Sequence, residues 1–400
     1  MNKGNKNNKK FTRLKYIAVA AALLFLLLPD AITNSMQITT RALVTVLGVD
    51  RTVDGGYEVT AQLVLPQSSS DTPQTQDFVY ASGGTLKSAL DGVSAKTGKR
   101  ANLAHCKLLF LGDSALKESA IDSLEFFLRA PEVDNGLMLA AASGTAKDAV
   151  KKLSGFDKLS AFSLPDFLSQ NNANGGNSTV TLKNFMEARY SGIGDLTLPV
   201  IDITEKSGGE KDEGGEDDGN PEFPSAELSA EFKTAVIKGG KLIETLKTEN
   251  TRRLAWLDKK AKTGTLVLEN FGGGGNEKIA LDIKKKTIKK KASFGGGKPV
   301  YTVDICLKLS LDEAGSNYTN ISYGEKKKLS GEIKAAAREK INADIQSLHE
   351  ECVAGGFDIM SINEKFFRRK NKRYKKYIAT GGDILKDCLI KVKTDCEIKI

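Results

Sequence analysis

The sequence has few of the residues that carry most metal, redox and acid–base chemistry. Its 400 residues include two histidines, one tryptophan and five cysteines. The cysteines form no C-x-x-C pair and no Cys/His spacing typical of a metal site. The sequence therefore predicts neither a structural zinc site nor a thiol-redox motif.

A disulfide framework is not expected either. Cys388 and Cys396 fall on one face of a predicted strand at the C-terminus. At about 3.3 Å per residue they would lie roughly 26 Å apart, which is beyond disulfide reach. We interpret all five cysteines as small buried hydrophobic residues, namely Cys106, Cys306, Cys352, Cys388 and Cys396.

Nor does a catalytic arrangement stand out. His105 adjoins a predicted buried strand, and neither it nor His349 lies near a G-x-S-x-G elbow. The glycine runs at 272–275 and 295–297 lack the Lys-Ser/Thr that grips phosphates. A carboxylate pair for sugar cleavage is left open, because acidic residues are plentiful. We predict no catalytic, cofactor-binding or metal-binding residue, and no enzyme activity.

A full membrane-spanning run is also missing. The apolar run from Tyr16 to Leu28 has thirteen residues, whereas a span needs about 20. Six lysines and arginines precede it within the first fifteen residues, which places the chain beyond about residue 36 outside the cytoplasm. Pro29-Asp30-Ala31 is a poor cleavage site, so we expect residues 1–36 to be an uncleaved signal anchor rather than a cleaved signal peptide.

The composition of the chain is that of a folded globular protein. Hydrophobic residues make up 40% and charged residues 27%, with a net charge of +9, and the length suggests two or three modules. Six more lysines lie within 284–291. We interpret this run as an exposed edge strand, with contact to anionic lipid headgroups or an acidic partner loop as the alternative. The basic stretch 366–377 is expected to be a connecting loop or helix end rather than an RNA site.

A βαβ unit organises the N-terminal module, residues 37–205. The apolar run 106–111 predicts a buried strand, and Asp113 or Ser114 can cap a helix that ends before Pro131. A second apolar run, 137–142, then predicts a parallel strand. Further predicted elements of this module are a hairpin over 43–47 and 57–63, a helix over 85–94, a helix from Thr145 to Leu153, and a strand or helix start over 178–185.

An acidic, glycine-rich segment, 206–224, is expected to link this module to a C-terminal α+β module, 225–400. The segment lacks the ligand order of a calcium loop. In the second module, strand patterns precede a long helix that starts at Ser322-x-x-Glu325 and ends at Gly355-Gly356. Whether 225–280 is a separate small domain is left open. The fold class is thus α+β, or mixed α/β, in two to three modules behind a membrane anchor.

Three segments of the chain carry motifs that belong together. H-x-K-x-x-x-x-G (His105, Lys107, Gly112) is followed by L-x-F-F-L-R-x-P-E (Leu124 to Glu132). With the segments 42–66 and 234–257, this pair of motifs resembles the Ger(x)C family, the C subunits of spore germinant receptors. The segment 42–66 resembles the first strand pair of the family, and 234–257 resembles the opening of its C-terminal module.

The resemblance implies a non-catalytic subunit of a nutrient germinant receptor, required for spore germination, with a three-domain mixed α/β body outside the spore inner membrane. Its partners would be two integral-membrane subunits, of A and B type, with no nucleic acid. Contact with the small-molecule germinant is left open. Arg129 and Glu132 are expected to pair locally rather than to contact a partner. The alternatives are a membrane-anchored cell-wall hydrolase and an extracytoplasmic solute-binding protein.

One detail departs from the family. Its members normally carry a lipid-modified cysteine about eighteen residues before the G-x-D motif, here Gly48-Val49-Asp50. This chain has Ile32 near that position and no cysteine before Cys106. A peptide anchor would therefore replace the acyl chain.

Overall fold

The computed structural model describes most of the chain beyond residue 40. The described residues are 15–19, 41–64, 76–156, 160–176, 178–201, 204–205, 226–227, 233–269, 271, 278–313 and 323–399. Residues 15–19 are helical, but the rest of the expected anchor and the whole acidic segment 206–224 lie outside these ranges. Within them, no helix is both long and apolar enough to cross a membrane.

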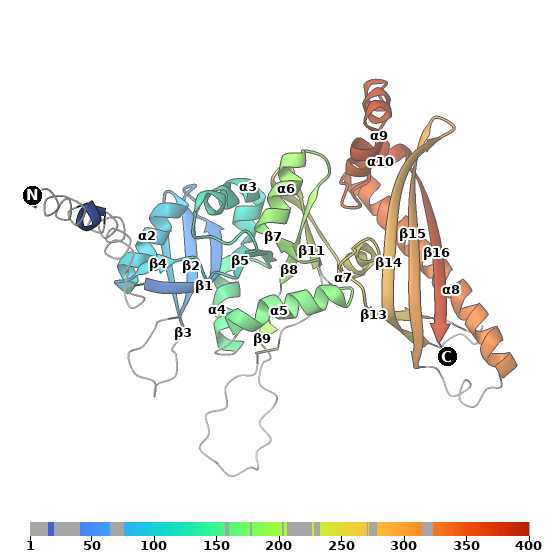
Figure 1. Cartoon of the computed structure of the whole chain (residues 1–400), viewed down its shortest axis with the longest axis horizontal. Coiled ribbons are helices and arrows are strands. Elements are labelled where there is room, and N and C mark those ends of the chain that lie inside the picture. The colour runs from blue at the N-terminus through green and yellow to red at the C-terminus, as the bar shows by residue number, and fades with distance from the viewer. Residues whose placement is uncertain are drawn as a thin grey trace, which may run out of the picture.

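Two β-sheets, side by side along the molecule, form the body (Figure 1). The first has ten strands, in the order β12 (Lys241–Leu246), β11 (Lys233–Lys238), β8 (Leu196–Ile201), β6 (Met138–Ala142), β5 (Leu108–Leu111), β1 (Arg41–Arg51), β2 (Tyr57–Val64) and β3 (Gln76–Gly83), with β4 (Arg100–Asn102) beside β1 and β7 (Val180–Thr181) beside β6. Between β8 and β11 in the sequence, β9 (Thr204–Glu205) and β10 (Ala226–Glu227) pair only with each other within the described residues.

The predicted βαβ unit is confirmed at the centre of the first sheet. Strands β5 and β6 are parallel, with Leu109 opposite Leu139, and α3 (Asp113–Arg129) connects them. The predicted hairpin is β1–β2, with Leu47 opposite Ala61. Strands β1, β5, β6 and β8 all run parallel, and the outer strands β2, β3, β11 and β12 join the sheet through antiparallel pairs.

Helices cover both faces of this sheet, which explains why its central strands are apolar on both sides. The helices α2 (Leu86–Thr97), α3 and α6 (Leu182–Ser191) pack on one face, and α4 (Ala146–Phe156) and α5 (Ser160–Ala173) pack on the other. The sequence predicted either a strand or the start of a helix at 178–185. The structure has both there, because the short strand β7 leads directly into α6.

The first sheet takes in strands that the sequence analysis assigned to the module 225–400. Strand β11 is antiparallel to β8, with Ala235 opposite Leu198, and β12 forms the outer edge. Val236 and Leu246 nevertheless contact the core of the second sheet. The hairpin therefore belongs to the first sheet and lies at the junction of the two.

The second sheet has four strands, in the order β13 (Gly264–Leu268), β14 (Ile279–Gly295), β15 (Lys298–Glu313) and β16 (Leu389–Lys399). Strands β15 and β16 are parallel, and the other pairs are antiparallel. The short helix α7 (Thr248–Ala255) connects the two sheets. Together the sheets confirm an α+β body.

The predicted long helix is α8 (Tyr323–Gly355), which packs against the second sheet through an apolar stripe. All seven stripe residues are buried: Leu329, Ile333, Ala337, Ile341, Ile345, Leu348 and Cys352. Two further helices follow, α9 (Ile362–Ala379) and α10 (Ile384–Asp387). The expectation of a connecting loop or helix end at 366–377 was wrong, because α9 runs through the whole stretch.

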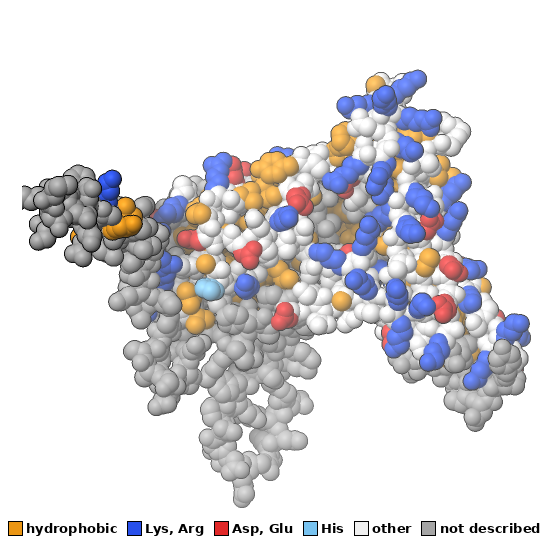
Figure 2. Space-filling model, viewed as in Figure 1, with side chains coloured by type: hydrophobic (Ala, Val, Ile, Leu, Met, Phe, Trp, Pro, Cys, Tyr) orange, Lys and Arg blue, Asp and Glu red, His pale blue; other side chains and the backbone are white. Residues whose placement is uncertain are grey.

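The lysine run lies on β14 where that strand has only one partner. Strand β13 pairs with β14 only as far as Ile283, and the rest of β14 pairs with β15. Four of its lysines are exposed, as an edge strand requires. The prediction was wrong for Lys286, which is buried, and for Lys290, which is half-buried. Lysine and arginine side chains are also densest over this second module (Figure 2).

Candidate functional site

The G-x-D motif organises the start of α4. Asp50 lies at the carboxyl end of β1 and is buried. Its two carboxylate oxygens accept hydrogen bonds from the backbone N–H groups of Ala146 (2.9 Å) and Lys147 (3.0 Å). These groups belong to the first turn of α4, where backbone N–H groups have no partner within the helix. Asp50 thus ties the end of β1 to a helix that begins 96 residues later in the sequence.

Two motif glycines leave room for this contact. A Cβ atom on Gly112 would lie 1.8 Å from Oδ1 of Asp50, and one on Gly48 would lie 2.9 Å from the backbone oxygen of Ala146. Neither contact can form without displacing the helix start. The motif residues Gly48, Asp50 and Gly112 therefore have a structural role at this point of the fold.

Charge and local capping also act on this helix start. Burial is the largest influence on the pKa of Asp50 and raises it, although the two backbone hydrogen bonds act in the opposite direction. Thr145 and Asp148 form the predicted cap of α4, with Asp148 N donating to Thr145 Oγ1 at 3.0 Å. At α3, by contrast, Gly112 is the N-cap residue. Ser114 instead accepts a hydrogen bond from Arg51 N.

The exposed residues of the H-x-K and L-x-F-F-L-R-x-P-E motifs gather at the opposite edge of the first sheet. Lys107 precedes β5, and Arg129 ends the helix that returns to the amino end of β6. His105, Lys107, Arg129 and Glu132 are all exposed. The predicted local pairing of Arg129 is confirmed, but its partner is Glu125, one turn earlier, rather than Glu132.

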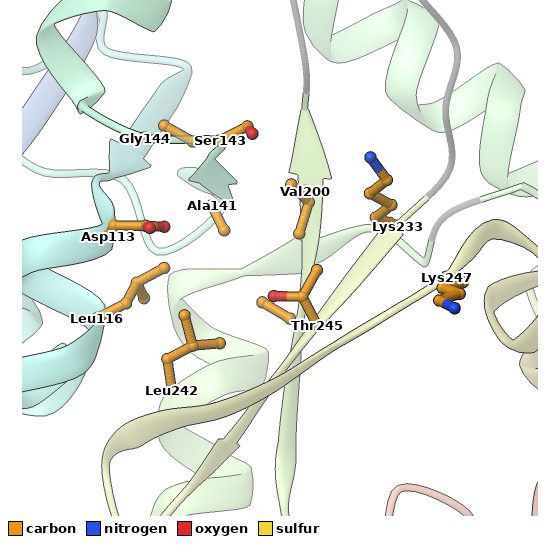
Figure 3. A pocket seen from close by; sticks show the side chains of 12 residues that line it. Asp113, Leu116, Ala141, Ser143, Gly144, Val200, Lys233, Leu242, Thr245 and Lys247 are labelled. Atoms are coloured by element: carbon orange, nitrogen blue, oxygen red, sulfur yellow. The ribbon is translucent and has the colours of Figure 1, made fainter. Parts of the chain in front are cut away.

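A pocket of about 310 Å³ opens at the carboxyl edge of the parallel strands, the edge where ligands of open α/β sheets usually bind. Asp113 lies on one side of it, and Lys233 and Lys247 lie on the other (Figure 3). Ser143 and Gly144, which follow β6, line the rim. Such a pocket can hold a small polar molecule, although the Asp113 carboxylate already pairs with Lys117 at 2.9 Å.

The two histidines are far from this pocket in the fold. His105 lies at the amino ends of the parallel strands, and His349 lies on α8 in the second module. His349 is buried, and its Nε2 is 2.9 Å from the backbone oxygen of Leu385, so it is a packing residue. In the part of the chain that the structure describes, no group of histidine, cysteine and acidic side chains has the geometry to hold a metal ion.

The interpretation of the cysteines as buried hydrophobic residues is confirmed for four of the five. Cys306 is exposed, because it faces outward on β15. None forms a disulfide bond. Burial raises the pKa of Cys106, Cys352 and Cys388 to about 12. Cys388 also lies just before β16 rather than within it.

Sequence patterns missed the residues that join the two modules. The Asp358 carboxylate accepts hydrogen bonds from Ile362 N (2.9 Å) and Asn363 N (2.7 Å) at the start of α9. The backbone N–H of Asp358 donates to Asp195 of the first module at 2.7 Å. Both aspartates are isolated in the sequence, and no pattern relates positions 163 residues apart.

Comparisons with known proteins agree with these motifs over nearly the whole chain. Residues 34–203 match the family model described as spore germination protein N-terminal domain. Residues 233–399 match the model described as spore germination B3/GerAC like, C-terminal.

Two relatives from Bacillus subtilis (strain 168) and one solved structure extend the match. Spore germination protein B3 is 26% identical over 275 residues, which is 67% of each chain. Spore germination protein KC is 22% identical over 396 residues, 96% of this chain and 95% of that protein. The crystal structure of the GerBC protein shares the fold, with a TM-score of 0.53 and 18% identity over 88% of this chain and 97% of its own. Taken with the motifs at Gly48, His105 and Arg129, these matches establish that the chain belongs to the Ger(x)C family of spore germination proteins.

Proposed function

We propose that this chain is the C-type subunit of a nutrient germinant receptor in the spore inner membrane. Its folded body lies on the extracytoplasmic face and works beside the A- and B-type integral-membrane subunits without catalysing a reaction. The two family matches, which follow one another in the expected order, carry this proposal. The basic N-terminus followed by an apolar run supports the orientation.

The amino edge of the parallel strands is the surface that we assign to the membrane partners. The motif residues His105, Lys107, Arg129 and Glu132 are exposed there. The motif residues at the other end of the strands, Asp50 and Gly112, are occupied in holding α4. Exposed charged residues at an interface affect partner choice and association rate more than stability.

Affinity purification tests the assembly. The tagged full-length chain is purified from detergent-solubilised spore membranes, and mass spectrometry identifies what accompanies it. We expect a permease-like subunit and a second multi-span subunit. Recovery of the chain alone, from membranes in which both subunits are present and intact, would count against the receptor assignment. Hydrolysis of purified peptidoglycan by the chain would favour the cell-wall hydrolase instead.

A charge reversal tests the surface. Arg129→Glu should reduce recovery of the membrane subunits without changing the unfolding temperature by more than about 2 °C, because Arg129 is exposed and its ion pair is worth under about 0.5 kcal/mol. Lys87→Glu is the matched control, since Lys87 also forms an exposed ion pair with a residue four positions away on a helix. Equal recovery of the membrane subunits with both variants would show that Arg129 is not part of the interface, and the proposed assembly would still stand.

A further inference from the structure

A second cavity lies where the two modules meet. Its volume is about 290 Å³, roughly ten times the share of one molecule in liquid water. The first module contributes polar groups to its lining, from Thr179, Asn184 and Thr197. The second contributes apolar side chains, including Leu257 and Ile359. Any molecule held there would touch both modules.

One wall of the cavity carries the half-buried side chain of Lys290. Lys286 and Lys290 point to the same side of β14, four residues apart, because side chains alternate along a strand. Lys286 is buried and donates a hydrogen bond to the backbone oxygen of Ala255. Lys290 lines the cavity, and its ammonium group makes no hydrogen bond and no ion pair within 4.0 Å to any residue in the described ranges. This ammonium group is therefore available to an anionic ligand.

The carboxylates near Lys290 are engaged with other donors. Asp258 accepts hydrogen bonds from Ser178 Oγ (2.9 Å) and Lys260 N (2.8 Å), and Asp358 caps α9. The charged groups that act on Lys290 are Asp258, Lys365, Lys259 and Asp358. With Lys260, which lines the cavity, and Lys290 itself, four lysines stand against two aspartates. The charged residues that line the cavity itself are Lys260, Lys290 and Asp258, so its lining has a net positive charge.

We propose that this cavity binds a small organic carboxylate, with its carboxylate group at Lys290 and its carbon chain against Leu257 and Ile359. The neighbouring Thr197 and Asn184 side chains offer a hydroxyl and an amide group to the same ligand. Because the ligand contacts both modules, its binding stabilises their junction, where Asp195 already bonds to Asp358. The proposal is independent of the receptor function, since it depends only on the cavity and its charges.

The protonation of Lys290 gives this site a defined pH range. Burial lowers the pKa of Lys290 to about 8, and the nearby Lys365 and Lys259 act in the same direction against Asp258 and Asp358. The ammonium form that holds a carboxylate is thus present at pH 7 and largely lost at pH 9. An arginine at this position keeps its charge throughout.

The test is calorimetric titration of the full-length chain, in a non-ionic detergent, with acetate, butyrate and hexanoate at pH 7. We expect saturable binding that strengthens by up to about fourfold for each added methylene group. Lys290→Gln should weaken it at least tenfold, and Lys289→Gln, which changes an exposed lysine of the same strand, should leave it unchanged. At pH 9 the wild-type chain should lose at least fivefold in affinity, and Lys290→Arg should not.

Three results would overturn the proposal: no saturable binding of any of these carboxylates, equal binding by Lys290→Gln and the wild-type chain, or binding of inorganic phosphate alone. Circular dichroism of each variant at both pH values establishes that it is folded before it is titrated.

Discussion

Asp50→Asn tests whether the G-x-D motif is a structural joint between β1 and α4. The wild-type carboxylate accepts two backbone hydrogen bonds from the first turn of α4, and its negative charge faces the positive end of that helix. Asparagine keeps one acceptor oxygen and replaces the other with a donor that faces an N–H group. The substitution therefore removes one charge-assisted hydrogen bond, worth about 1.5–3 kcal/mol.

The cost of burying the carboxylate reduces this figure. Burial of the carboxylate, which raises the pKa of Asp50, is a cost that asparagine avoids, so we expect a net loss of about 2 kcal/mol. Asp50→Ala leaves both buried N–H groups of α4 without an acceptor and should lose more, about 3–4 kcal/mol. For a module of this size, 2 kcal/mol lowers the unfolding temperature by about 4–8 °C.

Thermal and urea unfolding, followed by circular dichroism, measure both losses. Asp122→Asn is the matched control, because Asp122 is an exposed aspartate on α3, and it should change stability by less than about 0.5 kcal/mol. The reasoning is refuted if Asp50→Asn is no more destabilising than the control. It is also refuted if alanine and asparagine at position 50 are equivalent.

Three other substitutions or reactions follow from local environments. Gly331→Ala on α8 should stabilise the chain by about 0.5–1 kcal/mol in urea unfolding, because a methyl group there meets open space; a loss of stability would contradict this. Lys286→Met should stabilise the folded chain by about 2 kcal/mol at pH 7. It removes a buried charge, whose cost appears as a pKa lowered to about 8, and the loss of the hydrogen bond to Ala255 offsets about 1 kcal/mol of that gain. Between pH 8 and 10.5 only the unfolded wild-type chain keeps this proton, so wild-type stability should rise with pH and the advantage of methionine should shrink; a constant difference between pH 7 and pH 9.5 would show that Lys286 is not the cause. Cys306, the exposed cysteine, should react with iodoacetamide in the folded chain, whereas the four buried cysteines should react only after unfolding. Mass spectrometry of the labelled peptides measures this, and labelling of a buried cysteine before Cys306 would contradict it.

The elements that the sequence predicted correctly are those with strong local signals. The βαβ unit, the β1–β2 hairpin and α8 each combine an apolar period with a turn or capping residue nearby. Apolar residues that recur every second position indicate the buried face of a strand, and those that recur every three to four positions indicate the buried face of a helix. Such patterns are therefore enough to place these elements and to identify their buried faces.

The failures share a physical cause, because they depend on contacts between distant segments. The hairpin β11–β12 has an ordinary strand pattern, and nothing in that pattern states which sheet it will join. Helix α9 buries only Ile362 and Phe366, so its apolar period is weak, and its start depends on Asp358. Lys286 and Lys290 fall on the inward face of β14, which a run of six lysines in eight positions conceals.

The parallel pairing of β15 with β16 constrains the order in which the chain can fold. Val300 pairs with Leu389, and Ser310 pairs with Lys399, so this pairing is complete only after the chain has been made through Lys399. The first sheet has all its strands by Leu246 and can assemble while the rest is still being synthesised. A chain that ended before β16 would thus carry a finished first module and expose the long edge of β15, a template for aggregation. Translation through β16 is thus a condition for a complete four-stranded second sheet.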